Sequence, residues 1–401
     1  MRSLISGYRT MNANLFQDAS LHIAVVTTKC NLACSYCQAR VAKPEDMSPE
    51  VATRVLQYLY DVKAPAIVLE FQGGEPLVNW SVVRMMIESA RKFNTAGKDL
   101  RIALVSNLLL LDDEKMKVLV DNDVQVCSSL DGPAEVHDAN RRSVGGKGTY
   151  RQVIRKAKEF KAKHGQQVAF LPTITKQSLK YPKEIIDEYV RLEQTEICLR
   201  PVNHMGSACP QWGDLGYGPE EFCDFYVRAM EHLLDLNGRG VNIAERTARV
   251  ILSKVLSKED PGYVDMMNPC GAGRTTMAYM PDGSCYPCDE ARIIGEEMFR
   301  LGNIVEEGYE DMVKKENLLQ LLHASCSDLW HYGSAFSPWM GFCPVVNYAI
   351  QKNVVPKAAC SPAQKIMQFQ FRYVFEKILE GGGTLDILKS WVERGRHGKK
   401  T

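Results

Sequence analysis

The sequence predicts an α/β fold: a partial (β/α)6 TIM-like barrel, then a cysteine-rich domain and C-terminal helices. Three observations predict it. In the first half of the chain, short β-branched runs alternate with stretches of helical periodicity. After about residue 200 the alternation stops at a Gly- and Pro-rich segment. Six cysteines then fall between residues 268 and 360. An open, doubly wound sheet is the alternative to the barrel.

Each strand and helix of the barrel has its own local signal. Six runs have the composition and length of strands, at residues 21–28, 66–72, 100–107, 124–131, 167–175 and 195–201. Helical runs lie between them, at residues 48–62, 80–93, 112–122, 149–163 and 178–192. Ser48 is the expected N-cap of the first helix, with Pro49 in its first turn. In such folds ligands bind at the C-terminal ends of the strands, so one mouth is expected to collect the functional residues.

The pattern also predicts the domain boundaries. Two amphipathic runs follow the Gly- and Pro-rich segment, at residues 219–236 and 243–257. The tail reads as two helices separated by "EGGG" at 380–383. The expected units are an N-terminal segment 1–20, a barrel 21–215, a helical linker 216–265, an auxiliary domain 266–362 and C-terminal helices 363–401.

Composition limits the classes of function. The chain has 401 residues, and Lys plus Arg number 49 against 48 Asp plus Glu, so no net field favours nucleic acid or an anionic membrane. No apolar run is long enough to span a bilayer, and the first residues lack a signal peptide's apolar centre. A cytoplasmic location is therefore expected. In that reducing compartment, thirteen cysteines favour metal ligation over disulfides.

Cys30, Cys34 and Cys37 form the pattern C-x3-C-x2-C in a loop directly after the first predicted strand. A structural zinc site usually takes four protein ligands, and an iron-sulfur cube has four iron corners to ligate. Three thiolates make sense if a small molecule binds the remaining iron. The alternative is a structural metal.

The motifs "CNLACSYC", "EFQGGEP", "VSNLLL" and "SSLDGPAEVHDANR" follow in order along the chain. Together they resemble the signature of radical S-adenosylmethionine enzymes. The resemblance implies a [4Fe–4S] cluster on the three cysteines and S-adenosylmethionine on the open iron. An electron from the cluster then cleaves the sulfonium, and the resulting 5'-deoxyadenosyl radical removes a hydrogen atom from the substrate. The implied cofactor-binding residues are Tyr36, Gly73, Gly74, Glu75, Asn107, Ser129, Asp131 and either Arg141 or Arg142.

These residues have assigned roles under the resemblance. Tyr36 offers an aromatic face to the base, and Gly73 and Gly74 allow close backbone approach. Glu75 accepts from the methionine ammonium. Taken singly, "GGEP" is a turn and Ser-x-Asp is a cap. An iron-sulfur electron carrier is the non-enzyme alternative, and it would produce no 5'-deoxyadenosine from S-adenosylmethionine and dithionite.

The segment "CGAGRTTMAYMPDGSCYPCDE", from Cys270 onward, resembles the SPASM extension of peptide-modifying radical enzymes, which usually holds two auxiliary clusters. Here the extension is eroded, because His331, Ser334 and Met340 stand where cysteines are expected. The resemblance implies at least one auxiliary [4Fe–4S] cluster on Cys270, Cys288 and Cys343, with Cys285 as the nearest candidate for the fourth ligand. A second cluster would have only Cys326 and Cys360.

Across residues 20 to 360 the chain resembles the radical maturases of the His-Xaa-Ser peptide system, and more loosely the anaerobic sulfatase maturases. Both imply a peptide substrate, here a ribosomally made precursor that is crosslinked or oxidised. A small-molecule substrate and a formylglycine-type oxidation are the alternatives. Asp289 matches the general base of the sulfatase maturases, with a cap or turn acid as the other interpretation. Arg200, Asn203 and His204 are expected at the barrel mouth.

The expected partners follow from this chemistry. The enzyme needs a reductant such as flavodoxin or ferredoxin. Only some twenty residues precede the first strand, too few for a leader-binding domain. Leader recognition is therefore expected from the barrel mouth, the 201–260 helices, a second maturase or a separate leader-binding protein.

Overall fold

The computed structural model describes residues 19–257, 261–327, 335–337, 339–355 and 361–397. His331, Ser334 and Cys360, three residues on which expectations rest, lie outside these ranges. Among the described residues, no helix is both long enough and apolar enough to cross a bilayer.

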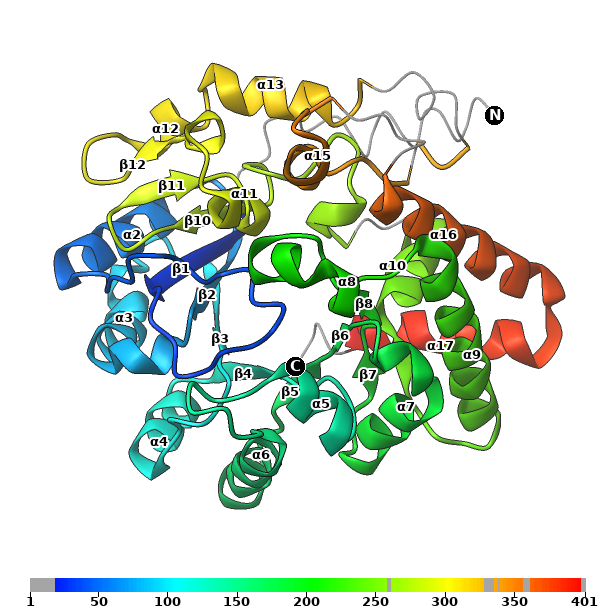
Figure 1. The fold of residues 1–401 in the computed structure, drawn as a ribbon. Coiled ribbons are helices and arrows are strands. Elements are labelled where there is room, and N and C mark those ends of the chain that lie inside the picture. The colour runs from blue at the N-terminus through cyan, green and yellow to red at the C-terminus, as the bar shows by residue number, and fades with distance from the viewer. Residues whose placement is uncertain (1–18, 258–260, 328–334, 338, 356–360, 398–401) are drawn as a thin grey trace.

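An eight-stranded sheet is the centre of the fold, in the order β12-β11-β10-β1-β2-β3-β4-β5 (Figure 1). Strands β1 to β5 pair in parallel, as expected for a βα barrel. The strands of this sheet are β1 Leu21–Thr27, β2 Ala66–Gly73, β3 Asp99–Val105, β4 Val124–Ser129, β5 Ala169–Leu171, β10 Thr276–Tyr279, β11 Ser284–Tyr286 and β12 Gly302–Asn303.

The fifth and sixth predicted strands are each interrupted. Pro172, which has no N–H to donate, separates β5 from β6 (Thr173–Ile174). The sixth run forms β7 (Glu196–Ile197) and β8 (Arg200–Pro201). Strand β6 pairs with β8, and β7 pairs with β9 (Ala244–Glu245), both in parallel. All six predicted strands are therefore present, and the partial barrel is confirmed with its last strands in a separate, irregular part.

Helices cover the barrel and extend it on one side. The α-helices of the barrel half are α2 Pro49–Asp61, α3 Trp80–Phe93, α4 Asp113–Asp121, α5 Ala134–Asn140, α6 Tyr150–His164 and α7 Pro182–Arg191. The linker and tail contain α8 Trp212–Leu215, α9 Pro219–Gly238, α10 Arg246–Leu256, α16 Pro362–Glu380 and α17 Gly382–His397. The cysteine-rich part contains α11 Asp289–Ile294, α12 Tyr309–Met312, α13 Glu316–Ala324 and α15 Pro344–Gln351. Short 3-10 helices are η1 Pro76–Asn79, η2 Ser178–Lys180, η3 Gly206–Gln211, η4 Val264–Met266 and η5 Glu297–Phe299.

The sequence signals placed most helix ends correctly. Ser48 accepts a hydrogen bond from Val51 N at 3.3 Å, so it is the N-cap of α2. Helix α5 was not predicted, because its seven residues are too short to show a helical period. Helix α16 ends at Gly381, which has a φ of 68°, and α17 begins one residue later inside the predicted break.

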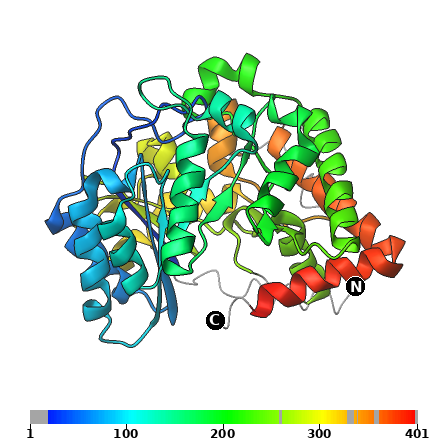
Figure 2. The same cartoon turned by 90° about the horizontal axis from the view of Figure 1, so that it is seen from below.

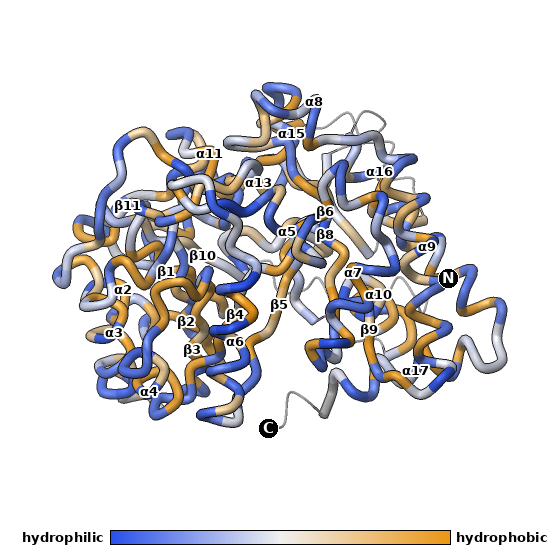
Figure 3. The backbone as a smooth tube through the Cα atoms, turned by 60° about the horizontal axis from the view of Figure 1, so that its bottom comes forward, coloured by the Kyte–Doolittle hydropathy of each residue, from blue (hydrophilic) through white to orange (hydrophobic). Residues whose placement is uncertain are grey.

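The linker and tail helices pack on one another beside the barrel. Helix α17 lies against α9, α10 and α16, and Figure 2 shows it in red across the lower edge of this group. Trp391 in α17 is fully buried and donates through Nε1 to Asn237 Oδ1 of α9 at 3.2 Å. In Figure 3 the tube is orange along much of β1 to β4, which form the apolar centre of the barrel half.

The cysteine-rich domain is joined to the barrel through the sheet. Strand β10 pairs in parallel with β1, from Leu21 opposite Thr276 to Ala24 opposite Tyr279. The hairpin of β10 and β11 then runs antiparallel along this edge. This pairing brings the segment that starts at Cys270 to the edge of the barrel.

Candidate active site and auxiliary cluster site

The three cysteines of the first motif lie in one loop after β1. Cys30 is exposed, while Cys34 and Cys37 are partly buried. Leu32 N donates to Cys30 Sγ at 3.4 Å, and Cys37 N donates to Cys34 O at 3.2 Å, so the loop is held as two tight turns. The pKa of the Cys30 thiol is raised to about 11, chiefly because the surrounding protein removes water from around its sulfur; the Leu32 N–H opposes this rise, and Glu75, Cys34 and Cys37 add to it. Cys34 and Cys37 are therefore close enough to Cys30 for their charges to affect its pKa.

The glycines of "QGGEP" hold this loop in place. A Cβ on Gly73, whose φ is 153°, would lie 2.1 Å from Thr27 O. A Cβ on Gly74 would lie 2.3 Å from Lys29 O and 2.9 Å from Cys30 Cβ. The expected close approach is present, and its partner within the chain is the backbone of the cysteine loop.

Glu75 joins three parts of the mouth. Its side chain is 1% exposed and accepts from Ser106 Oγ at 2.8 Å, Asn107 N at 2.7 Å and Leu77 N at 3.1 Å. Burial raises the pKa of Glu75 to about 7, although these three hydrogen bonds favour its ionised form. A carboxylate has about four lone-pair sites, so one remains for a further donor. This geometry leaves room for the predicted contact with an ammonium group.

The polar ends of β3 and β4 surround the same loop. Asn107 donates through Nδ2 to Asn31 Oδ1 at 2.7 Å, which ties the end of β3 to the cysteine loop. Ser129, half-buried, ends β4 opposite Leu171 of β5. Both therefore lie at the mouth where the sequence placed them.

Asp131 and Tyr36 are joined to each other and to Arg141. Asp131 has no exposed surface, and it accepts from Tyr36 Oη at 2.6 Å, from Thr173 N at 3.1 Å and from Arg141 Nε at 3.2 Å. The Arg141 guanidinium lies over the Tyr36 ring, 5.1 Å from its centroid. One of the two faces of the Tyr36 ring is thus covered by Arg141. Asp131 positions Tyr36 and Arg141 through these bonds, and its contact with the cofactor stays a prediction.

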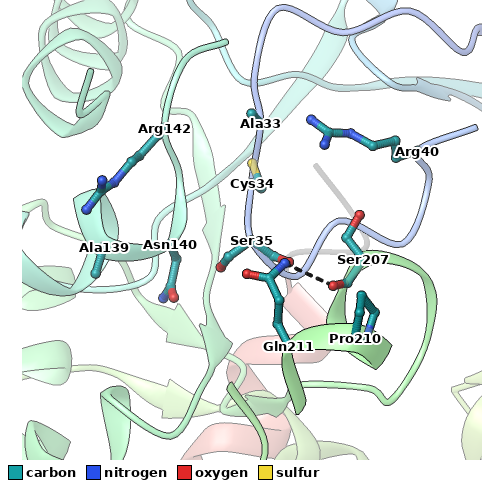
Figure 4. A pocket seen from close by; sticks show the side chains of 10 residues that line it. All are labelled: Ala33, Cys34, Ser35, Arg40, Ala139, Asn140, Arg142, Ser207, Pro210 and Gln211. Atoms are coloured by element: carbon teal, nitrogen blue, oxygen red, sulfur yellow. Dashed lines mark hydrogen bonds between the residues drawn. The ribbon is translucent and has the colours of Figure 1, made fainter. Parts of the chain in front are cut away.

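Arg142 points to a different place from Arg141. It is exposed and donates through Nε to Asp138 O at 3.1 Å. It lines an open cavity of about 470 Å³ on the cysteine loop (Figure 4). The same cavity is lined by Cys34 and by Gln211, whose Nε2 donates to Ser35 O at 3.1 Å. Of the two arginines, Arg142 is therefore the one available to a ligand beside the loop.

Cys270, Cys288 and Cys343 line one small cavity in the second half of the molecule. Cys288 is the N-cap of α11 and Cys343 the N-cap of α15, and each sulfur accepts a backbone N–H at 3.4 Å, from Ala291 and Val346 respectively. Burial raises the pKa of the Cys288 thiol well above its ordinary value, and Glu290, Cys343 and Cys270 raise it further. The structure thus brings together the three thiols expected to hold an auxiliary cluster.

Cys285 does not join them, which corrects the expectation for the fourth ligand. It lies on β11, fully buried, opposite Tyr279. It raises the pKa of Tyr58 and of Tyr279, and its own pKa is raised by burial and then by Glu307. Cys285 therefore packs beside Tyr58 and Tyr279 and does not line the cavity of Cys270, Cys288 and Cys343.

Cys326 and Met340 are the remaining described residues of the expected extension. Cys326 donates through Sγ to Leu322 O and His323 O, both at 3.5 Å, at the end of α13, and does not line the cluster cavity. Met340 is fully buried. Among the described residues, no three His, Cys, Asp or Glu side chains converge as they would on one metal ion.

A second cavity, of about 270 Å³, lies between the barrel mouth, the auxiliary domain and α16. Arg200 and Asn203 line it from the barrel side, as expected, together with Cys198. His204 instead packs on Trp212, with ring centroids 4.4 Å apart. Glu290, Phe342 and Cys343 line both cavities, so the two are neighbours.

Asp289 is ion-paired at the start of α11. Arg292 donates to its Oδ1 through Nε at 2.8 Å and through Nη2 at 2.6 Å, and donates to Gln72 Oε1 of β2 at 2.9 Å. Arg292 thus ties the predicted base to the barrel strand that ends in "QGGEP". Sequence reasoning missed Glu290, Arg292 and Gln72, because no motif marks them. The sequence offered one signal for Glu290: it follows Cys288 by two residues, and both lie in the first turn of a helix.

Comparison with known proteins gives consistent results. Residues 24–189 match the Radical SAM superfamily. The chain is 27% identical over 312 residues to a cysteine-type anaerobic sulfatase-maturating enzyme of Clostridium perfringens, covering 74% of this chain and 79% of that protein. The structure of anSMEcpe with bound AdoMet and the Kp18Cys peptide has a TM-score of 0.73 and 20% identity, covering 89% of this chain and 98% of that one. The structure of Streptococcus suis SuiB bound to its precursor peptide SuiA has a TM-score of 0.63 and 16% identity, covering 88% and 77%.

Proposed function

We propose that this chain, whose residues 24–189 form a radical SAM domain, is a maturase that modifies a residue of a ribosomally made peptide. When bound, the cluster and S-adenosylmethionine supply a radical that removes a hydrogen atom from an unactivated carbon. Cys30, Cys34 and Cys37 would hold that cluster. Their loop carries three sulfurs near one another and no fourth protein ligand of the same motif, which fits a cube with one open iron.

The cavity of about 270 Å³ between the barrel mouth, the auxiliary domain and α16 is the observation that best supports a peptide substrate. Arg200 and Asn203 line it from the barrel, and Gln364 and Gln370 line it from α16. Amide and guanidinium groups can pair with the C=O and N–H groups of a peptide backbone. The two solved relatives with similar folds were each observed with a peptide, which supports the same substrate class here.

The chain's own residues have separate tasks in this scheme. Glu75 binds the methionine ammonium, and Asn107 orients the cysteine loop through Asn31. Asp289 accepts the proton released as the substrate is oxidised. Its ion pair with Arg292, which also donates to Gln72 of β2, holds the carboxylate at the start of α11 on the side of the barrel.

A formylglycine-type oxidation of a sulfatase is the second candidate function. Asp289 directly after Cys288 favours it, and so does the similarity to the Clostridium perfringens sulfatase-maturating enzyme. Under this alternative the modified residue is a cysteine or serine of a sulfatase polypeptide. The chemistry of the first half of the site is the same for both functions.

Mass spectrometry separates the two candidates. The chain is co-expressed anaerobically with the short peptide encoded beside its gene, and separately with a sulfatase-derived Cys peptide. A mass change on the neighbouring peptide that disappears in the Cys30→Ala variant supports a precursor-peptide maturase. Formylglycine on the sulfatase peptide alone supports the second function. 5'-Deoxyadenosine without change in either peptide would contradict both.

A further inference from the structure

The auxiliary cluster cavity contains a fourth group that can bind iron. Besides Cys270, Cys288 and Cys343, the side chain of Glu290 lines it. The other lining residues carry no side-chain ligand for iron; they are Val264, Ala272, Leu321, Phe342, Pro344 and Val345. Three thiols and one carboxylate are therefore the donor set that the described part of the chain offers at this place.

The local fold explains why Glu290 faces the thiols. Cys288 caps α11, and Glu290 is the second residue of that helix, so both lie in the same first turn. Helix α11 packs against α15, whose N-cap is Cys343. Glu290 is 8% exposed, and its Oε1 lies 4.0 Å from Arg200 Nη2. A carboxylate held this way has one side toward the thiols and one toward the arginine.

We infer that Glu290 is the fourth protein ligand of the auxiliary cluster, in the place where a thiolate would otherwise complete a four-cysteine site. This inference rests on the proposed auxiliary cluster and adds the identity of its fourth ligand. An ionised carboxylate is an established iron ligand, although harder than a thiolate. A buried carboxylate is costly unless it is paired or bound to a metal, and iron on one side with Arg200 on the other satisfies it.

The alternatives within the chain are less suitable. Cys285 lies on β11 among tyrosines, and Cys326 donates to the carbonyls that end α13. Asp289, the neighbouring acid, is held by Arg292 on the barrel side. Because Glu290 also lines the substrate cavity, the iron that it binds would be the corner of the cluster nearest to the peptide.

Isotope labelling of the glutamate carboxyl group tests for the bond between Glu290 and iron. The variant with Cys30, Cys34 and Cys37 all changed to Ala retains only the auxiliary cluster, and it is grown with glutamate carrying ¹³C in its side-chain carboxyl group. After reduction, pulsed EPR should detect a ¹³C hyperfine coupling to the cluster. On the same background, Glu290→Ala should lose the coupling, and Cys285→Ala should retain it together with all of the iron.

The outcomes separate this inference from the proposed function. A triple-Ala background without iron would overturn the auxiliary cluster itself. A full iron content without ¹³C coupling would overturn the role of Glu290 and leave the cluster in place, as would loss of iron in Cys285→Ala. If Glu290→Ala loses its cluster or fails to fold, Glu290→Cys decides, since it should keep about four irons while losing the coupling.

Discussion

Glu75 combines a buried position with hydrogen bonds from Ser106, Asn107 and Leu77. Changing it to Gln keeps its shape and removes its charge. The lost bond to the methionine ammonium is worth about 1.5 to 3 kcal/mol, so affinity for S-adenosylmethionine should fall by about one to two orders of magnitude. Calorimetry measures this directly. Ser106→Ala is the control, because it removes one neutral partner and leaves the charge. Unchanged affinity in a folded Glu75→Gln variant would reduce "GGEP" to a turn.

Gly74 faces the backbone of the cysteine loop. The Cβ of Gly74→Ala would lie 2.3 Å from Lys29 O, so the loop must move. The displaced thiolates should no longer hold their cluster, and iron should fall from about eight to about four atoms per chain. Gly238→Ala is the control, since no atom lies within 4 Å of its added Cβ. Full iron content in Gly74→Ala would show that the loop tolerates the shift.

At the scale of elements, His22 links the barrel to the auxiliary domain. It lies on β1, fully buried, with Nδ1 2.7 Å from Tyr279 Oη of the neighbouring strand β10 and Nε2 3.1 Å from Ala19 O. Burial lowers the pKa of His22 from 6.5 to about 4. The folded state therefore holds the imidazole neutral, while the unfolded chain takes up a proton below pH 6.5.

This difference predicts a pH dependence of stability. The contribution of neutral His22 is fully present above pH 6.5 and is lost as the pH falls toward 4, up to about 3 kcal/mol. Anaerobic denaturant titrations between pH 5 and 7.5 should show a shallower pH slope for His22→Gln than for the wild type. His323→Gln, at an exposed position, should keep the wild-type slope. Equal slopes in all three proteins would contradict the assignment.

The elements also show what the sequence could and could not predict. Long periodic helices such as α2, α3 and α6, and the first four strands, were predictable because their patterns are local. The pairing of β10 with β1 was not, because it joins residues more than 250 positions apart. The same limit applies to the site. Cys30, Cys34 and Cys37 could be grouped from the sequence because they share one loop. That Glu290 lines the cavity of Cys270, Cys288 and Cys343, and that Cys285 does not, depends on how β11 and α11 pack in the folded chain.

The whole molecule is predicted to hold two clusters. We propose that Cys30, Cys34 and Cys37 hold one, and that Cys270, Cys288, Cys343 and Glu290 hold the other, so anaerobically reconstituted protein should contain about eight irons. Cys326→Ala should leave this content unchanged, because its thiol donates to α13 carbonyls and does not line the cavity of Cys270, Cys288 and Cys343. About twelve irons, with a cluster lost on removing Cys326 or Cys360, would instead indicate a second auxiliary cluster.

We propose that the loop after β1 holds the cluster that generates the radical, while the auxiliary domain holds the second cluster. The most direct measurement compares the wild type with the variant in which Cys30, Cys34 and Cys37 are Ala, under dithionite and S-adenosylmethionine. The variant should form no 5'-deoxyadenosine and should still hold about four irons. Continued formation of 5'-deoxyadenosine by the variant would contradict this proposal.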